Sequence, residues 1–319
     1  MLHAYRPASH GLALLDPGAD LGSALWIDLY RPLDSQVEAV EALGIGVPSL
    51  TDMEEIEISN RLFRENGVDY MTVVLPGLST TLTPTSGPVT FILGGGRLVT
   101  VRHHAPRPFE TFPDRADKSA AGCGSAERIL LGLVEECVAR LADLLEAVGR
   151  ELDAVSAAVF GGTAAPRPEV LQAALEQTGR QGDLLNRIRL GLLSLERAMS
   201  FYGLTVTERP EGKALRGIVK GQMRDLQALE VHADFLSSRV GLAVDATLGM
   251  VNLAQNATVR IVSVVAVLFL PPTLIASIYG MNFPNMPELT APWGYAFALV
   301  LMLVSALGTY LFFRWKRWL

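Results

Sequence analysis

The sequence predicts an α+β protein with an N-terminal α/β domain, then long helices that form a stalk, then two C-terminal transmembrane helices. Short runs in which apolar and polar residues alternate lie before residue 118 and indicate strands. Sequence rich in Ala, Leu, Glu and Arg begins at Ser125 and is typical of long helices. Two long apolar segments near the C-terminus indicate membrane spans.

The composition already excludes several classes of protein. The 319 residues are 50% hydrophobic and only 19% charged, with a mean hydropathy of +0.30, against roughly 25% charged residues in an ordinary soluble domain. A net charge of −6 argues against nucleic acid as a partner, because phosphate binding needs clustered Lys and Arg. Cys123 and Cys137 have no metal-site or disulfide-framework spacing, so we expect reduced thiols.

Residues 1–118 are predicted to form the α/β domain. Strands are expected at 24–29, 70–76, 89–94 and 97–102, the last two joined in a hairpin by Gly94, Gly95 and Gly96. Helices are expected at 34–43 and 49–65, the second with Ser49 or Thr51 as its N-cap. No nucleophile, base and orienting residue form a recognisable set, so enzymatic activity is not expected.

Long helices are predicted for the middle of the chain. The helical segment 119–211 contains helices at about 125–160 and 168–202, with Pro168 near the first helical position. A stalk helix follows at 212–260. Since no proline lies between Glu211 and Leu270, one helix could run from about Lys213 to Tyr279, a length on the order of 100 Å.

Two membrane spans are predicted at 261–279 and 293–313. The 53 residues from 261 to 313 contain one charged side chain, Glu288, which lies in the intervening loop 280–292. At about 1.5 Å per residue the spans measure about 28 and 32 Å, close to the roughly 30 Å of a bilayer core. Both segments are therefore expected to cross a lipid bilayer.

The charges that flank the spans predict their orientation. Arg260 precedes the first span, a basic collar of Arg314, Lys316 and Arg317 lies in the tail 314–319, and the loop has no Lys or Arg. The positive-inside rule then places both termini in the cytoplasm. The first residues have no apolar run typical of a signal peptide, so the α/β domain is expected to stay there.

A hydrophilic stripe follows one face of the helix that enters the first span. Its members are spaced alternately four and three residues apart, a 3.5-residue period kept for five heptads. The stripe comprises Asp245, Gly249, Asn252, Asn256, Val259, Ser263, Ala266, Leu270, Thr273 and Ser277, and it ends at Gly280. A coiled-coil dimer would have large apolar residues here, so these polar and small side chains indicate a face that lines water. Because two spans cannot enclose a conduit, a pore requires a ring of subunits.

Two alternatives remain open for this helix. Small residues with Ser and Thr on a membrane helix also allow close helix packing, although packing gives no reason for Asp245 and Asn256 in the stalk. Pro271 and Pro272 release backbone carbonyls within the span. Those prolines indicate either a simple kink or carbonyls that face the pore.

The loop after the first span carries the most specific motif, YGMNFPNMPEL at 279–289. In this position the Gly-Met-Asn tripeptide followed by MPEL resembles the CorA family of divalent-cation channels. The resemblance is strong throughout 255–289 and weaker at WIDLYRPL (26–33), EEIEISNRLF (54–63) and LVTVRHHAPRPF (98–109). It therefore extends over essentially the whole chain.

The resemblance implies a funnel-shaped homopentamer in a bacterial or archaeal inner membrane, which passes hydrated Mg²⁺, with Co²⁺ and Ni²⁺ as further candidates, and which needs no organic cofactor. It assigns Gly280, Met281 and Asn282 to the selectivity motif, with Asn282 meeting the ion through its water shell. It further assigns Thr273, Ser277 and Asn256 to polar pore positions, Val259 and Leu270 to apolar constrictions, and Asp245 to an acidic ring. These positions coincide with the stripe found from periodicity.

The family resemblance also implies closure by cytoplasmic Mg²⁺ held at carboxylates between subunits. The stretch 218–236 departs from the acidic pattern of some members and leaves Asp225 and Asp234 as candidates. A zinc-transporting relative, which MPEL argues against, and a cation sensor without conduction remain alternatives. The sequence leaves open the preference among Mg²⁺, Co²⁺, Ni²⁺ and Zn²⁺, the transport direction, the resting state, and the role of His103 and His104.

Overall fold

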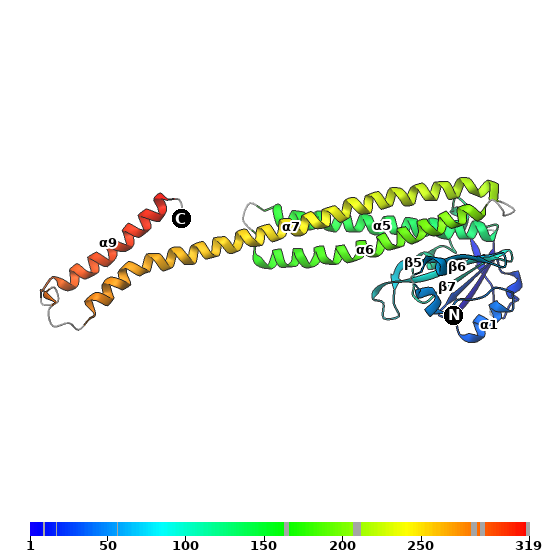
Figure 1. The fold of residues 1–319 in the computed structure, drawn as a ribbon, viewed down its shortest axis with the longest axis horizontal. Helices are drawn as coiled ribbons and strands as arrows, with labels where there is room; N and C mark the ends of the chain where they lie inside the picture. Colours follow the sequence, from blue (N-terminus) through cyan, green and yellow to red (C-terminus); the bar gives the residue numbers. More distant parts are fainter. Residues whose placement is uncertain are drawn as a thin grey trace. The chain divides into compact units, whose positions relative to one another are not determined.

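The structure is a computed structural model that describes residues 1–8, 10–16, 18–55, 57–162, 166–206, 212–281, 286–287 and 291–316. It contains two compact units (Figure 1). The first comprises Met1–Ala157 and Leu175–Val244, and the second comprises Ala158–Ala174 and Asp245–Leu319.

The first unit is built on a seven-stranded mixed sheet with the strand order β2-β1-β3-β7-β6-β5-β4. The strands are β1 (Leu2–Pro7), β2 (Leu12–Leu14), β3 (Trp26–Tyr30), β4 (Leu62–Glu65), β5 (Val68–Leu78), β6 (Pro84–Gly94) and β7 (Arg97–Arg102). Strand β3 pairs in parallel with β7, and the other described strand pairs are antiparallel. The predicted hairpin is confirmed, because Gly94 pairs with Arg97 and the intervening Gly95 and Gly96 have φ values of 58° and 73°.

The predicted helix at 49–65 is wrong in its second half. Helix α2 (Leu50–Glu54) begins after the N-cap Ser49, whose hydroxyl accepts from the Asp52 amide. A short helix α3 (Ile58–Arg61) then gives way to the strand β4. Phe63 stacks on Tyr70 at 4.6 Å between ring centroids, so pairing with β5 overrides the local helical pattern. The strand β1 and its neighbour β2, at one edge of the sheet, were not predicted.

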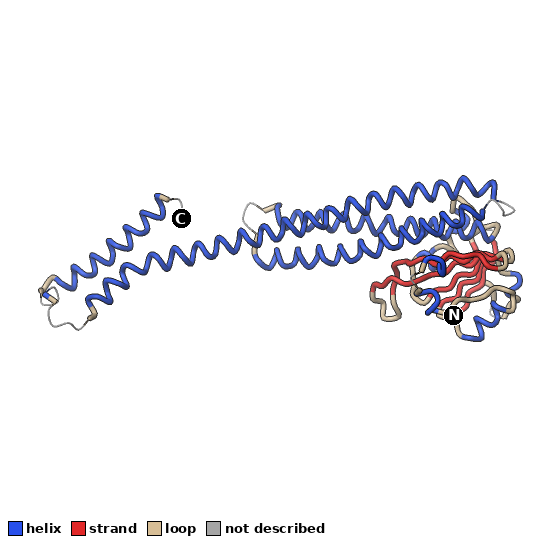
Figure 2. Tube along the Cα trace, in the orientation of Figure 1, coloured by secondary structure: helices blue, strands red, loops and turns tan. Residues whose placement is uncertain are grey.

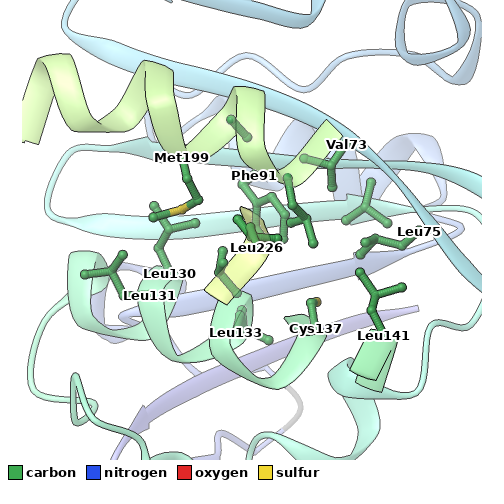
Figure 3. Packing of buried hydrophobic residues seen from close by; sticks show 14 of the residues in the cluster. Val73, Leu75, Phe91, Leu130, Leu131, Leu133, Cys137, Leu141, Met199 and Leu226 are labelled. Atoms are coloured by element: carbon green, nitrogen blue, oxygen red, sulfur yellow. The ribbon is translucent and has the colours of Figure 1, made fainter. Parts of the chain in front are cut away.

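Helices pack on both faces of the sheet. The longer helices α5 (Ala126–Phe160), α6 (Pro168–Thr205) and α7 (Gly212–Tyr279) confirm the predicted long helical segments (Figure 2). Figure 3 shows their contribution to the core, where Leu130 of α5, Met199 of α6 and Leu226 of α7 meet Phe91 of β6. The opposite face packs against α1 (Asp34–Glu41) and α2 through a separate cluster that includes Val40. Alternate strand residues thus fill two cores.

Three further short helices lie in the first unit. They are η1 (Leu21–Ser23), α4 (Pro108–Thr111) and η2 (Ala116–Lys118).

Two helices have the length and composition to cross a membrane, and their apolar parts lie in the second unit. One is the 68-residue α7, which carries an apolar window with a mean hydropathy of 2.4. The other is the 22-residue α9 (Gly294–Trp315), with a mean hydropathy of 2.2. Only 6% and 11% of the residues in these windows are buried in the chain, as expected of surfaces that face lipid or other subunits rather than a soluble core.

Candidate ion pathway along α7

The predicted stripe lies on the exposed surface of α7. Every stripe position from Asp245 to Ser277 is exposed in the single chain. Even the large apolar members Val259 and Leu270 are 63% and 66% exposed. The stripe is therefore available to face other subunits or water, which the predicted ring requires.

The opposite side of α7 is the covered side. Val264 is 7% exposed, and Leu268, Ile275 and Tyr279 are partly buried. At 100° per residue, the mean direction of these four residues lies about 170° around the helix from the stripe positions 263–277. Helix α9 runs beside this part of α7 in Figure 1 and is itself buried at Gly294, Ala298 and Phe313. The covered residues of α7 thus lie on the side that faces away from the stripe.

The two prolines lie within an unbroken helix, since α7 continues through Pro271 and Pro272 to Tyr279. Neither proline has an N–H group to donate to the carbonyl four residues earlier. Those carbonyls, at 267 and 268, lie about 80° and about 180° from the centre of the stripe. The positions favour a bend over carbonyls that face a pore. Thr273 Oγ1, on the stripe, donates to the Phe269 or Leu270 carbonyl, each 2.9 Å away.

The described structure includes the first two residues of the Gly-Met-Asn motif. The Gly280 amide donates to Ala276 O at 2.9 Å, and the Met281 amide donates to Ile278 O at 3.2 Å. These bonds extend the last turn of α7 into the loop, and Met281 is 45% exposed at its end. Asn282 lies outside the described residues, as do Glu288 and Arg317.

The basic collar begins within the last turn of α9. Arg314 lies in that turn and Lys316 is the C-cap, with its amide bonded to Phe312 O. The Lys316 ammonium lies 5.2 Å from the centroid of the Trp315 ring. A cation that follows an apolar helix in this way suits a lipid headgroup region.

The two candidate sensing carboxylates occupy different environments. Both side chains are exposed, and Asp234 differs in that it pairs with Arg189 of α6 at 2.8 Å. Among the described residues, no three His, Cys, Asp or Glu side chains converge as a metal site. A metal site built from carboxylates of two subunits would not be complete in a single chain.

Sequence reasoning missed an acidic neighbour of Asp234. Glu230 lines a cavity of about 390 Å³ together with Arg189 and Asp234. Burial raises the pKa of Glu230, and the negative charges of Glu196 and Asp234 raise it further. These groups lie on α6 and α7, so only the packing of the two helices reveals the cluster.

The α/β domain, the long helix α7 and the two membrane-length helices fit a membrane protein in which a large N-terminal domain precedes two C-terminal spans. More specifically, the chain belongs to the CorA-like Mg²⁺ transporter protein family, which matches residues 22–317. This is a family of membrane ion transporters rather than enzymes.

Similar sequences extend over the whole chain. The chain is 33% identical over 330 residues to the magnesium transport protein CorA of Yersinia pseudotuberculosis serotype I (strain IP32953), and 33% identical over 323 residues to that of Pasteurella multocida (strain Pm70). Each alignment covers 100% of both chains. The Salmonella typhimurium magnesium transport protein CorA is 32% identical over 330 residues, again with 100% of both chains covered.

Solved structures share the fold at lower sequence identity. The complete CorA magnesium transporter from Methanocaldococcus jannaschii gives a TM-score of 0.75 at 19% identity, with 100% of this chain and 99% of that chain covered. Full-length CmaX gives 0.62 at 15% identity, with 99% and 97% covered. The cytoplasmic domain of ZntB from Vibrio parahaemolyticus RIMD 2210633 gives 0.55 at 11% identity, with 77% and 96% covered.

Proposed function

We propose that this protein is a magnesium uptake channel, with cobalt and nickel as further candidate cargoes. Five copies of α7 surround a pathway lined by the hydrophilic stripe, and the second span of each copy lies on its lipid side. The observation that carries this proposal is the placement of the stripe on the face of α7 opposite the covered side. Family membership and the named magnesium transporters among its relatives support Mg²⁺ as the cargo.

The stripe and its loop suit a hydrated divalent ion. Mg²⁺ dehydrates reluctantly, so a ring of neutral Asn282 amides would hold it through its own waters. The hydroxyls of Thr273 and Ser277 continue a hydrophilic surface inward. Apolar rings at Val259 and Leu270 would close the pathway by excluding water.

The membrane potential supplies the driving force for entry. We assign residues 1–260 and the basic tail 314–319 to the cytoplasm, with the loop 280–292 outside. A divalent cation that moves down an inside-negative potential of 100 mV as it enters releases about 4.6 kcal/mol, twice the value for one charge. No chemical fuel is then needed for uptake.

Closure by cytoplasmic Mg²⁺ forms part of the proposal. Residues 1–259 contain 23 basic and 32 acidic residues, a net charge of −9 that favours cation binding to this part. Asp225 and Asp234 remain candidate ligands between subunits. Asp234 would have to exchange its ion pair with Arg189 for the metal.

The proposal is tested by flux into liposomes that contain the purified protein and a magnesium-sensitive dye. An inside-negative potassium diffusion potential should drive Mg²⁺ entry. Asn282→Ala should lower the initial rate at least tenfold, because the amide ring that meets the hydrated ion is lost. Asn285→Ala is the matched control from the same loop and should retain most of the flux.

Three results would contradict the proposal. Equal loss in Asn282→Ala and Asn285→Ala would refute the assignment of the filter residue. Proton-coupled Zn²⁺ flux in place of Mg²⁺ flux would identify a zinc transporter. No flux of any divalent ion from correctly folded protein would identify a cation sensor.

A further inference from the structure

The paired strands β5 and β6 extend into an uncharged finger, residues 76–86. The register continues to the pair Leu78 and Pro84, and the chain from 70 to 96 contains no Asp, Glu, Lys, Arg or His. The base of the finger is joined to the segment after β7 by two backbone bonds. The Leu78 amide donates to Ala105 O at 3.1 Å, and the Ala105 amide donates to Leu78 O at 2.9 Å.

The His104 side chain fills the space beneath this base. The residue is 5% exposed, and its Nε2 lies 2.9 Å from Leu75 O. A Cβ added at Gly77 would lie 2.8 Å from His104 Cδ2, and one added at Gly87 would lie 2.8 Å from Nδ1. The imidazole therefore packs directly against the glycine backbones of both strands of the finger.

The hydrogen bond to Leu75 O defines the tautomer of the neutral His104 ring. A carbonyl oxygen can only accept a hydrogen bond, so Nε2 of His104 carries a proton and donates this hydrogen bond to Leu75 O. Among the described residues, the buried Nδ1 has no hydrogen-bond partner. A proton on Nδ1 would leave an N–H group facing Gly87 without an acceptor, which is costly in a buried site.

The charges around His104 also oppose its protonation. The Arg102 guanidinium donates to His104 O at 3.2 Å and to Asp28 at 2.9 Å. Burial lowers the pKa of His104 most, and the positive charge of Arg102 lowers it further despite the bond to Leu75 O. The other titratable or charged groups nearby are His103 and Arg31 and, where α5 faces the same end of β5, Cys137 and Arg140.

The finger also connects the sheet to α6. Arg187 donates to Pro84 O at 2.8 Å, and the Val74 amide donates to Ser194 Oγ at 3.0 Å. A change in the pairing of β5 with its neighbours therefore alters two of the polar contacts between the sheet and this helix.

We propose that His104 is an acid-sensitive latch. The neutral imidazole holds the β5–β6 finger against the segment after β7, and uptake of a proton by His104 releases the finger. Release exposes the backbone groups that join Leu78 and Ala105 and loosens the attachment of the sheet to α6.

The sign of the pH dependence follows from proton linkage. His104 binds a proton more weakly in the latched state than in the released state, where its pKa is that of an ordinary histidine, about 6.5. The latch is thus at full strength above that pH and weakens as the pH falls. One linked proton raises the ratio of released to latched molecules as the pH falls below about 6.5, with a limiting slope of about tenfold per pH unit.

Hydrogen exchange of the full-length protein in lipid nanodiscs tests the latch. Exchange is measured between pH 7.5 and 5.5 and corrected for the intrinsic pH dependence of amide exchange. The opening constants of the Leu78 and Ala105 amides should rise by up to about tenfold between pH 7.5 and 5.5. Amides of α5 should show no comparable rise.

His104→Gln retains an N–H donor for Leu75 O but cannot titrate, so it should abolish the acid-induced rise. His10→Gln, which replaces a histidine whose side chain is 92% exposed, is the control and should leave the rise unchanged. His103→Gln tests the adjacent ring and should also retain the rise. An unchanged rise in His104→Gln, or no rise in the wild-type protein, would overturn the proposal. If His104→Gln does not fold, the pH dependence of exchange in the wild-type protein still tests the proposal.

Discussion

A buried ion pair joins the two parallel strands at the centre of the sheet. Asp28 of β3 and Arg102 of β7 meet at 2.9 Å, and their side chains are 2% and 6% exposed. Burial alone would raise the pKa of Asp28, but the nearby His3 imidazole, the Arg102 charge, and hydrogen bonds from Arg102 and Thr100 lower it. Arg102 also lies over the Tyr30 ring, 4.4 Å from its centroid. Both charges are thus compensated within the core.

Removing one partner of this pair should be strongly destabilising. Arg102→Met leaves the Asp28 carboxylate buried without its cation, which typically costs about 3–5 kcal/mol. The midpoint of thermal unfolding of the purified protein should fall on the order of 10 °C. Arg115→Met, which breaks an exposed pair with Glu136, is the control and should cost about 0–1 kcal/mol. Similar losses in the two variants would contradict this reading of the buried pair.

At the scale of elements, the two sides of α7 differ in burial and in composition. The side with Val264 and Ile275 is covered, whereas the side with Thr273 and Ser277 is open. A helix that faced only lipid would have no reason to place hydroxyl groups along one line. The open side therefore has the composition of a surface shared with water or other subunits.

Thiol labelling distinguishes the two faces. In a Cys123→Ser background, Ser277→Cys should react with a charged, membrane-impermeant thiol reagent at least tenfold faster than Ile275→Cys, because only position 277 faces the proposed water-filled pathway. Native Cys137 is fully buried, and burial raises its pKa, so it should contribute little background. Equal labelling at 275 and 277 would show that the stripe does not line water.

At the scale of the whole molecule, one helix carries residues of both compact units. Helix α7 contributes Leu215 and Leu226 to the soluble core and continues through Asp245 to the end of the first span. Outside 261–313 the chain has 59 charged residues in 266, about the fraction of an ordinary soluble domain. The apolar excess is thus confined to the part that meets the bilayer.

This continuity predicts a gating role for Asp245. Asp245→Ala should change the internal Mg²⁺ concentration that closes the channel more than it changes selectivity, because the residue belongs to the stalk portion of α7 rather than to the Gly-Met-Asn motif. Patch-clamp or liposome flux measurements at graded internal Mg²⁺ would reveal the shift. Asn252→Ala is the comparison variant, because it replaces an uncharged residue of the same stripe. An unchanged response to internal Mg²⁺ in Asp245→Ala would contradict the gating role.

The sequence by itself determined the long helices, the two apolar spans and the hydrophilic stripe. Each depends on a local pattern, since a bilayer selects length and apolarity and a helix repeats every 3.6 residues. The motif at 279–289 further indicated the family, which the comparisons confirmed. The roles of the stripe and of Asn282 stay predictions.

Only the tertiary structure decided the features that join distant parts of the chain. These include the conversion of 62–65 into a strand by pairing with β5, the parallel pairing of β3 with β7, and the covered face of α7. The adjacent histidines show the same limit: the sequence placed them after a strand, but the glycine-lined surroundings of His104 arise from β5 and β6. Contacts between residues far apart in sequence leave no local period, so packing alone reveals them.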